Sequence, residues 1–176
     1  MSKIHYQVHS TDNSKPWVVL IHGLFGSLDN LSGLRRHFCK DFQVLSVDLP
    51  DHGKSEHTQT FSFENYATLI MQLLDELGIQ ATALIGHSLG GKVAMTMALK
   101  QPNIISHLVV IDIAPVDYAP RHTQVIEGLK SVDLQRLANR GEADKILQEF
   151  IPEASTRMFL LKSLYAENNQ WHWRFN

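Results

Sequence analysis

The sequence predicts an α/β fold, a mostly parallel β-sheet with helices on both faces. Three observations predict it. Short apolar runs alternate with segments of helical periodicity along the chain. The run Trp17–Ile21 is continuously apolar, as is typical of a strand buried on both faces. The 176 residues, 44% of them hydrophobic, suffice to bury a sizeable core.

Most of the elements can be placed by their periodicity and by the glycines and prolines that bound them. Gly78 is expected to end the longest helix, and Pro102 follows the next one. The expected elements are an edge strand at 3–9, a central strand at 17–21, a helix at 30–40, a buried strand at 43–48, a helix from 62 or 63 to 77, a strand at 82–85, a helix at 92–100 and a buried strand at 108–111.

The pattern changes after residue 117, where apolar residues recur at helical spacing and glycines interrupt them. Residues 118–166 are expected to form several short helices without intervening strands, broken at Gly128, Gly141 and Pro152. Residues 170–175 alternate polar and aromatic side chains, which is typical of an edge strand or an unpaired tail. We therefore expect an α/β core at 1–117 and a helical lid with its exit strand at 118–176.

Composition argues against several classes of protein. A net charge of −2 provides no field suited to nucleic acid or to an anionic membrane surface. No apolar run has the length of a membrane span, and His5, His9 and Asp12 interrupt the segment where a signal peptide would lie. The single cysteine, Cys39, fits a reducing compartment. We predict a cytoplasmic protein without a metal site, since its ten histidines show no metal-ligand spacing.

The most informative segment is Gly-His-Ser-Leu-Gly at residues 86–90, between the strand-like and the helix-like runs. A serine at a sharp strand-to-helix turn needs small residues two positions before and after it, and glycine stands at both. Such a turn would present the hydroxyl of Ser88 as a nucleophile. It would also leave the amide of Leu89 at a helix N-terminus, where an oxyanion can be bound.

A second glycine-rich loop, residues 22–27, follows the central strand. Its position suits the loop that supplies the other oxyanion donor, and the amide of Leu24, with Phe25 as the alternative, is expected to pair with Leu89. The remaining residues expected to line a substrate pocket, which would be apolar, are His22, Gly23, His87 and Met95.

These segments together resemble the α/β-hydrolase superfamily. The residues that carry the resemblance are His22-Gly23, the Asp-x-x-x-x-Gly-x-Ser block at 48–55, Gly86 to Gly90, and the segment 110–118, which resembles that of the bacterial YbfF-type esterases. The resemblance implies that 48–55 is mainly a structural turn, so that Asp48, Asp51 and His52 lie outside a catalytic triad. It also implies that Asp112 is the acid that orients a catalytic histidine.

No catalytic histidine is identified in the sequence. The family order places it after the acid, and only His122 and His172 follow Asp112, neither in the expected setting. By resemblance, the chain is expected to be the N-terminal part of a longer hydrolase whose remaining strands complete the sheet. We then expect the chain alone to be nearly inactive and to self-associate through an exposed sheet edge.

The expected function is hydrolysis of small carboxylic esters or thioesters through an acyl-serine, without metal or organic cofactor. Ser88 argues against a haloalkane dehalogenase, which uses an aspartate nucleophile on the same scaffold. A lactonase, a C–C bond hydrolase and an acyl-CoA thioesterase stay open, because serine serves in all three. The alternative from another class is a non-catalytic remnant that binds an acyl ligand or a partner chain.

Overall fold

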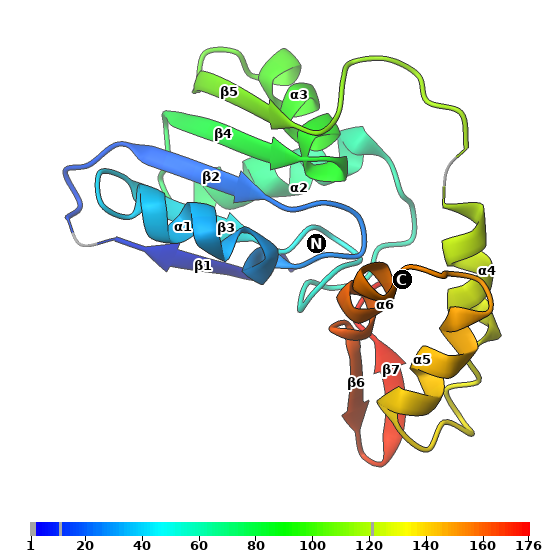
Figure 1. The fold of residues 1–176 in the computed structure, drawn as a ribbon. Coiled ribbons are helices and arrows are strands. Elements are labelled where there is room, and N and C mark those ends of the chain that lie inside the picture. The colour runs from blue at the N-terminus through cyan, green and yellow to red at the C-terminus, as the bar shows by residue number, and fades with distance from the viewer. Residues whose placement is uncertain (1–2, 11, 121) are drawn as a thin grey trace. The chain divides into compact units, whose positions relative to one another are not determined.

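The computed structural model describes residues 3–10, 12–120 and 122–176. The chain divides into two compact units, Met1–Pro115 and Val116–Asn176. The first unit contains a five-stranded sheet in the order β1-β3-β2-β4-β5 (Figure 1). β1 runs antiparallel to β3, and the other neighbouring strands are parallel. The strands are β1 (Tyr6–His9), β2 (Trp17–Ile21), β3 (Gln43–Val47), β4 (Thr82–His87) and β5 (Ile105–Ile111).

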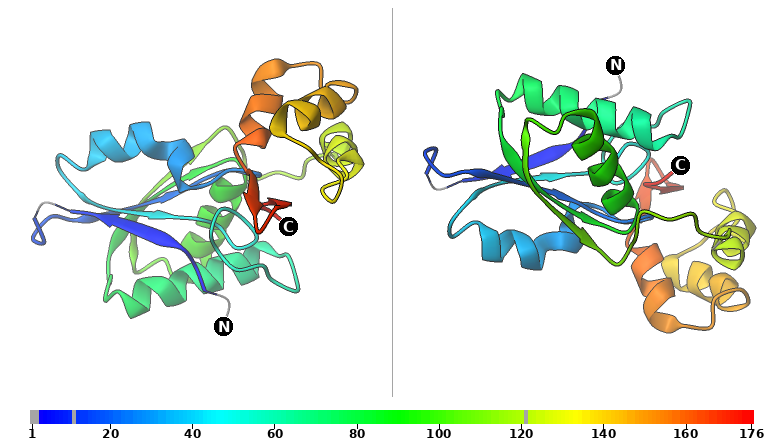
Figure 2. Two further views of the ribbon diagram at one scale, coloured as in Figure 1. Left: turned by 90° about the horizontal axis from the view of Figure 1, so that it is seen from below. Right: turned by 90° about the horizontal axis from the view of Figure 1, so that it is seen from above.

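Helices cover both faces of this sheet, as the sequence predicts (Figure 2). On one face, α1 (Ser32–Phe38), which a short 3-10 helix η1 (Leu28–Leu31) precedes, packs on Val18, Leu20 and Val44. On the other face, α2 (Phe63–Glu76) and α3 (Leu89–Lys100) pack on the core that contains Val19 and Ile21. Alternate residues of β2 thus serve two cores, because successive side chains of a strand point to opposite faces.

Local signals account for the length of α2. The hydroxyl of Ser62 accepts a hydrogen bond from the N–H of Asn65 and so caps the first turn. Gly78 lies just beyond the helix with φ of 68°, a conformation in which glycine carries no Cβ penalty. Between these ends, Ile70 and Leu74 are fully buried. Each such aliphatic side chain contributes about 2 kcal/mol of transfer free energy.

The expectation that residues 108–111 form a buried strand is wrong about burial. β5 forms, but Leu108 is 39% and Val109 is 47% exposed. The reason lies in the strand order, since β5 is the last strand of the sheet and β4 is its neighbour on one side only. An apolar run predicts a strand, and its place in the sheet decides how much of it is buried.

The second unit contains α4 (Thr123–Ser131), α5 (Arg140–Gln148), α6 (Ala154–Leu161) and an antiparallel hairpin of β6 (Leu164–Glu167) and β7 (Gln170–Trp173). The expected absence of strands in 118–166 is therefore wrong for β6. Asn168 and Asn169 form the turn with φ of 49° and 62°, and an Asn-Asn pair is a recognisable signal for such a turn.

The expected helix break at Gly128 is also wrong, because Gly128 is buried inside α4. A Cβ added there would lie 3.0 Å from the Cβ of Phe150, so glycine serves close packing. None of the helices in the described ranges is long and apolar enough to cross a membrane.

Candidate active site

The carboxyl ends of the four parallel strands share an unusual backbone feature. After β2, β3, β4 and β5 the chain places Phe25, Asp51, Ser88 and Asp112, respectively, in the left-handed region, with φ between 51° and 64°. Such conformations cost about 1–3 kcal/mol each in non-glycine residues and concentrate at functional sites. Because the carboxyl ends of parallel strands meet at one edge of a sheet, this edge is the candidate active site.

Ser88 lies between β4 and α3 with φ 51° and ψ −117°, in the strand-to-helix turn that the sequence predicts. Glycine is required on both sides of it. A Cβ at Gly86 would overlap the carbonyl of Gly90, and a Cβ at Gly90 would overlap the carbonyl oxygens of Ile21 and His22. The turn therefore depends on close contact between the start of α3 and the end of β2.

The two segments expected to supply oxyanion donors lie against each other. Leu89 is the first residue of α3, where a helix leaves its N–H groups without an acceptor in a preceding turn. A Cβ added at Gly23 would lie 3.2 Å from the Cβ of Ser88 and 2.8 Å from Nδ1 of His87. The loop that carries Leu24 and Phe25 is thus within reach of a group bound at Ser88.

Asp112 directly follows β5 and comes next to the serine turn. The N–H of Ser88 donates to the carbonyl oxygen of Ile111 over 2.9 Å, which ties the two strand ends together. The side chain of Asp112 is 84% exposed, and its carboxylate lies 3.9 Å from Nε2 of His87. The structure thus brings Ser88, His87 and Asp112 to one place.

His22 lies beneath the loop, with its side chain fully buried. The N–H of Leu49 donates to its Nε2 over 3.0 Å, so the ring hydrogen is on Nδ1, which donates to the carbonyl of Gly23 over 2.8 Å. Burial, and to a smaller extent the neighbouring His52, lower the pKa of His22 to about 4. His22 is thus neutral, and its buried ring, expected to line a pocket, instead supports the loop.

The turn at 48–55 is a network of buried hydrogen bonds. The carboxylate of Asp48, 2% exposed, accepts from the N–H groups of Leu28 and Lys54 and from Nδ1 of His5. Asp51 accepts from Thr58 and from the hydroxyl of Tyr66. Burial raises the pKa of Asp51, but these hydrogen bonds outweigh it and leave the pKa below its usual value.

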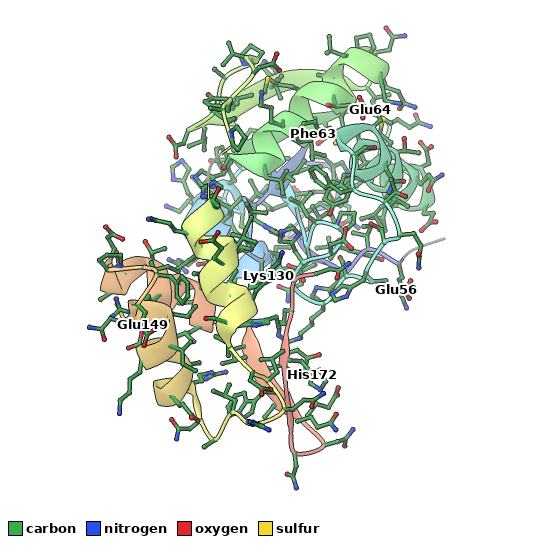
Figure 3. All side chains as sticks on the ribbon, turned by 90° about the vertical axis from the view of Figure 1, so that its right-hand side faces the viewer. Glu56, Phe63, Glu64, Lys130, Glu149 and His172 are labelled. Carbon is green, nitrogen blue, oxygen red and sulfur yellow. The ribbon has the colours of Figure 1, made fainter. Side chains whose placement is uncertain are left out.

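The remaining residues that the sequence indicated are Met95, His122 and His172. Met95 lies half-buried on α3 in the first unit. His122 and His172 belong to the second unit, where His122 precedes α4 and His172 projects from β7 with its ring 5.5 Å from that of Tyr165 (Figure 3). Sequence reasoning missed the supporting role of His22, and a polar residue at the end of an apolar strand is the signal that could have indicated it.

Comparison with known proteins identifies relatives across almost the whole chain. A family model described as the alpha/beta hydrolase fold matches residues 16–171. The sn-1-specific diacylglycerol lipase ABHD11 of Danio rerio is 37% identical over 97% of this chain and 56% of its own length. Esterase YbfF of Escherichia coli is 37% identical over 93% of this chain and 63% of its own length.

Solved structures agree with this likeness. A marine microorganism esterase superimposes with a TM-score of 0.95 and 29% identity, over all of this chain and 69% of the other. The chain thus spans 56% and 63% of the length of the two curated relatives.

Proposed function

The chain belongs to the α/β-hydrolase fold family, and from that premise we propose that it acts on small carboxylic esters or thioesters through a covalent acyl-Ser88 intermediate. One observation carries the proposal, namely the strained turn that holds Ser88 beside Asp112 at the carboxyl edge of the sheet. Relatives named as an esterase and as a lipase support ester substrates.

The proposed chemistry needs two steps. The oxygen of Ser88 attacks the acyl carbon, a base takes the serine proton, and the alcohol or thiol leaves with a proton. Water then attacks the acyl-enzyme and releases the acid. The amides of Leu89 and of Leu24 or Phe25 would stabilise the oxyanion in each step, and Asp112 would orient a histidine base. No step requires a metal or an organic cofactor.

The activity of residues 1–176 alone depends on whether a histidine of this chain can accept the proton of Ser88. His87 lies near Asp112, whereas His122 and His172 belong to the second unit. Loss of one triad member removes several orders of magnitude in rate, so we propose near-inactivity of residues 1–176 in isolation. We also propose a cytoplasmic site of action, and residues 118–176 as the lid with its exit strand.

Covalent labelling tests the proposal. The chain, together with a C-terminal segment supplied from a relative, is incubated with a fluorophosphonate, and the intact mass and the modified peptide are measured. We expect labelling at Ser88, no labelling of Ser88→Ala, and unchanged labelling of Ser106→Ala, which alters an exposed serine on β5. Hydrolysis of a short-chain aryl ester is measured in parallel, with and without a C-terminal segment supplied from a relative.

A second candidate function is binding without catalysis, of an acyl ligand or of a partner chain. One observation favours it. Nε2 of His87 lies 3.9 Å from the exposed carboxylate of Asp112, which is longer than a hydrogen bond that would orient a catalytic base. Ligand binding that persists in Ser88→Ala, without labelling of the unaltered chain, would select this function.

A further inference from the structure

A groove in the first unit lies at the β1 side of the sheet, whereas Ser88 follows β4, and β3 and β2 separate these two strands. The groove has a volume of about 320 Å³. It is lined by residues that precede or begin β1 and by the end of the turn after β3, namely Lys3, Ile4, His5, Tyr6, Lys54 and Glu56. This volume is at the lower end of the range of about 300–1,000 Å³ for ligand sites, so the groove suits a small molecule.

Hydrogen bonds hold the two walls of the groove together. The N–H of His5 donates to the hydroxyl oxygen of Ser55, and its carbonyl oxygen accepts the N–H of Asp48, each over 2.9 Å. The N–H of Glu56, which is labelled in Figure 3, donates to the carbonyl oxygen of Lys3 over 3.1 Å. The N–H of Lys3 donates in turn to the carboxylate of Glu56 over 2.9 Å. The main chain of both walls is therefore fixed before a ligand binds, which lowers the entropic cost of binding.

The charged groups of the groove favour an anionic ligand. Lys3 and Lys54 are exposed, and within the ranges that the structure describes neither ammonium group has an ion-pair partner. Among the described residues that line the groove, the acid is Glu56, and its carboxylate already accepts the N–H of Lys3. A phosphate monoester has a charge of about −1.5 to −2 at neutral pH, so both ammonium groups can contact it as point charges.

Apolar groups supply another part of the lining. Ile4 is 7% exposed and belongs to the core of the first unit, and Tyr6 is 38% exposed. Inorganic phosphate would leave these apolar groups uncovered, whereas the organic part of a phosphate ester removes apolar surface from water on both sides. The net charge of −2 gives the chain no field that would attract an extended anionic surface, which favours a single small molecule over a membrane.

We propose that this groove binds a small organic phosphate monoester, with the phosphate between the ammonium groups of Lys3 and Lys54 and the organic group against Ile4 and Tyr6. The inference goes beyond the proposed function, and it stands or falls independently of any reaction at Ser88. Because both lysines are exposed, salt screens each contact and each contributes modestly. The affinity should therefore be modest, with a Kd of about 1 mM, and it should weaken as the salt concentration rises.

The first experiment locates the site with phenyl phosphate as the probe. Main-chain amide chemical shifts of the isotope-labelled chain are measured by NMR during a titration. We expect saturable shifts at residues 3–6 and 54–56, and about tenfold weaker binding of benzenesulfonate, which has the same ring but a single charge. Absence of saturable shifts at these residues up to about 10 mM phenyl phosphate would overturn the proposal. Equal affinity for benzenesulfonate, or shifts confined to residues 22–27 and 86–90, would overturn it as well.

The second experiment changes the charges of the groove one at a time. Lys3→Gln and Lys54→Gln should each raise the Kd for phenyl phosphate about 3- to 10-fold. The matched control is Lys100→Gln, which removes an exposed lysine at the end of α3 and should leave the Kd unchanged. Glu56→Gln keeps an oxygen that can accept the N–H of Lys3 but removes the negative charge, so it should lower the Kd several-fold. An unchanged Kd in both groove lysine variants, or a raised Kd in Glu56→Gln, would contradict the proposed site.

Discussion

Two strands of the sheet each contain the same set of four apolar residues but differ in burial. Residues 18–21 of β2 and 108–111 of β5 each consist of two valines, one leucine and one isoleucine. In β2 all four are at most 1% exposed, whereas Leu108 and Val109 of β5 are 39% and 47% exposed. The difference comes from position, since β2 lies between β3 and β4 and β5 ends the sheet. An apolar composition predicts a strand, and the position of that strand in the sheet determines how much of it is buried.

The largest effect should come from a charge placed in each strand. Val19→Asp puts a carboxylate between β2 and the core of α2 and α3, where it has no partner, and should cost more than about 4 kcal/mol, enough to prevent folding. Val109→Asp places the same group at an exposed position and should cost less than about 1 kcal/mol. Circular dichroism and urea unfolding measure both.

Equal destabilisation by the two substitutions would break the comparison. It would mean that β5 is covered in solution by something that buries Val109. The matched pair Val19→Ala and Val109→Ala gives a milder check, since the first leaves a cavity and the second does not.

The second prediction concerns the carboxyl end of β2, which α3 also covers. Gly90→Ala would force a methyl group into the carbonyl oxygens of Ile21 and His22 and should lower the free energy of unfolding by about 3 kcal/mol. Gly33→Ala on α1 meets nothing within 4 Å and should raise it by up to about 1 kcal/mol. Thermal unfolding distinguishes them. A well-tolerated Gly90→Ala would contradict the close contact that shapes the Ser88 turn.

The third prediction compares His22, which follows β2, with His107, which is exposed on β5. The pKa of His22, at the end of β2, is lowered to about 4 by burial, and the unfolded chain binds the proton near its ordinary value of 6.5. The unfolded state therefore holds more protons between these values. The free energy of unfolding should have its full value above about pH 6.5, and it should fall by at most about 3 kcal/mol as the pH drops toward 4. Burial lowers the pKa of His52 also and adds in the same direction.

Urea unfolding at several pH values tests this dependence. His22→Phe should flatten the loss of stability below pH 6.5, although the variant is less stable at neutral pH. His107→Gln, which changes an exposed histidine on β5, should leave the slope unaltered. A slope that does not depend on His22 would show that other groups govern acid unfolding.

Much of the core could be predicted from sequence because local signals there agree with tertiary packing. The run at 17–21, the cap at Ser62 and the stop at Gly78 each point to the element that forms. The exposure of β5 could not be predicted, because it depends on strand order rather than on residues 108–111. The Gly128 break failed for a similar reason, since Phe150 lies against that glycine.

The candidate site shows the same limit. Ser88 and Asp112 could be placed because both follow strands whose ends converge in any parallel sheet. The role of His22 could not be predicted, because the residue type alone does not say whether a ring at a strand end turns toward the solvent or toward the core. Only the hydrogen bonds to Leu49 and Gly23 decide it.

The last and smallest effect concerns association at the two edges of the sheet. Val8 on β1 and Val109 on β5 have nearly equal exposure, 43% and 47%. The neighbours of Val8 alternate in burial, whereas Val109 stands in a continuous exposed run from Ser106. We propose that the chain self-associates through β5, since an exposed edge strand offers unpaired main-chain groups to another strand.

A lysine on an edge strand disfavours pairing with another strand. Val109→Lys should therefore weaken self-association several-fold, while Val8→Lys should change it little. Sedimentation velocity over a range of protein concentrations measures both, with unfolding free energies as a check that each variant is folded. A stronger effect of Val8→Lys would move the associating edge to β1. That result would also mean that an exposed apolar run is a weaker determinant of association than the direction of the edge strand.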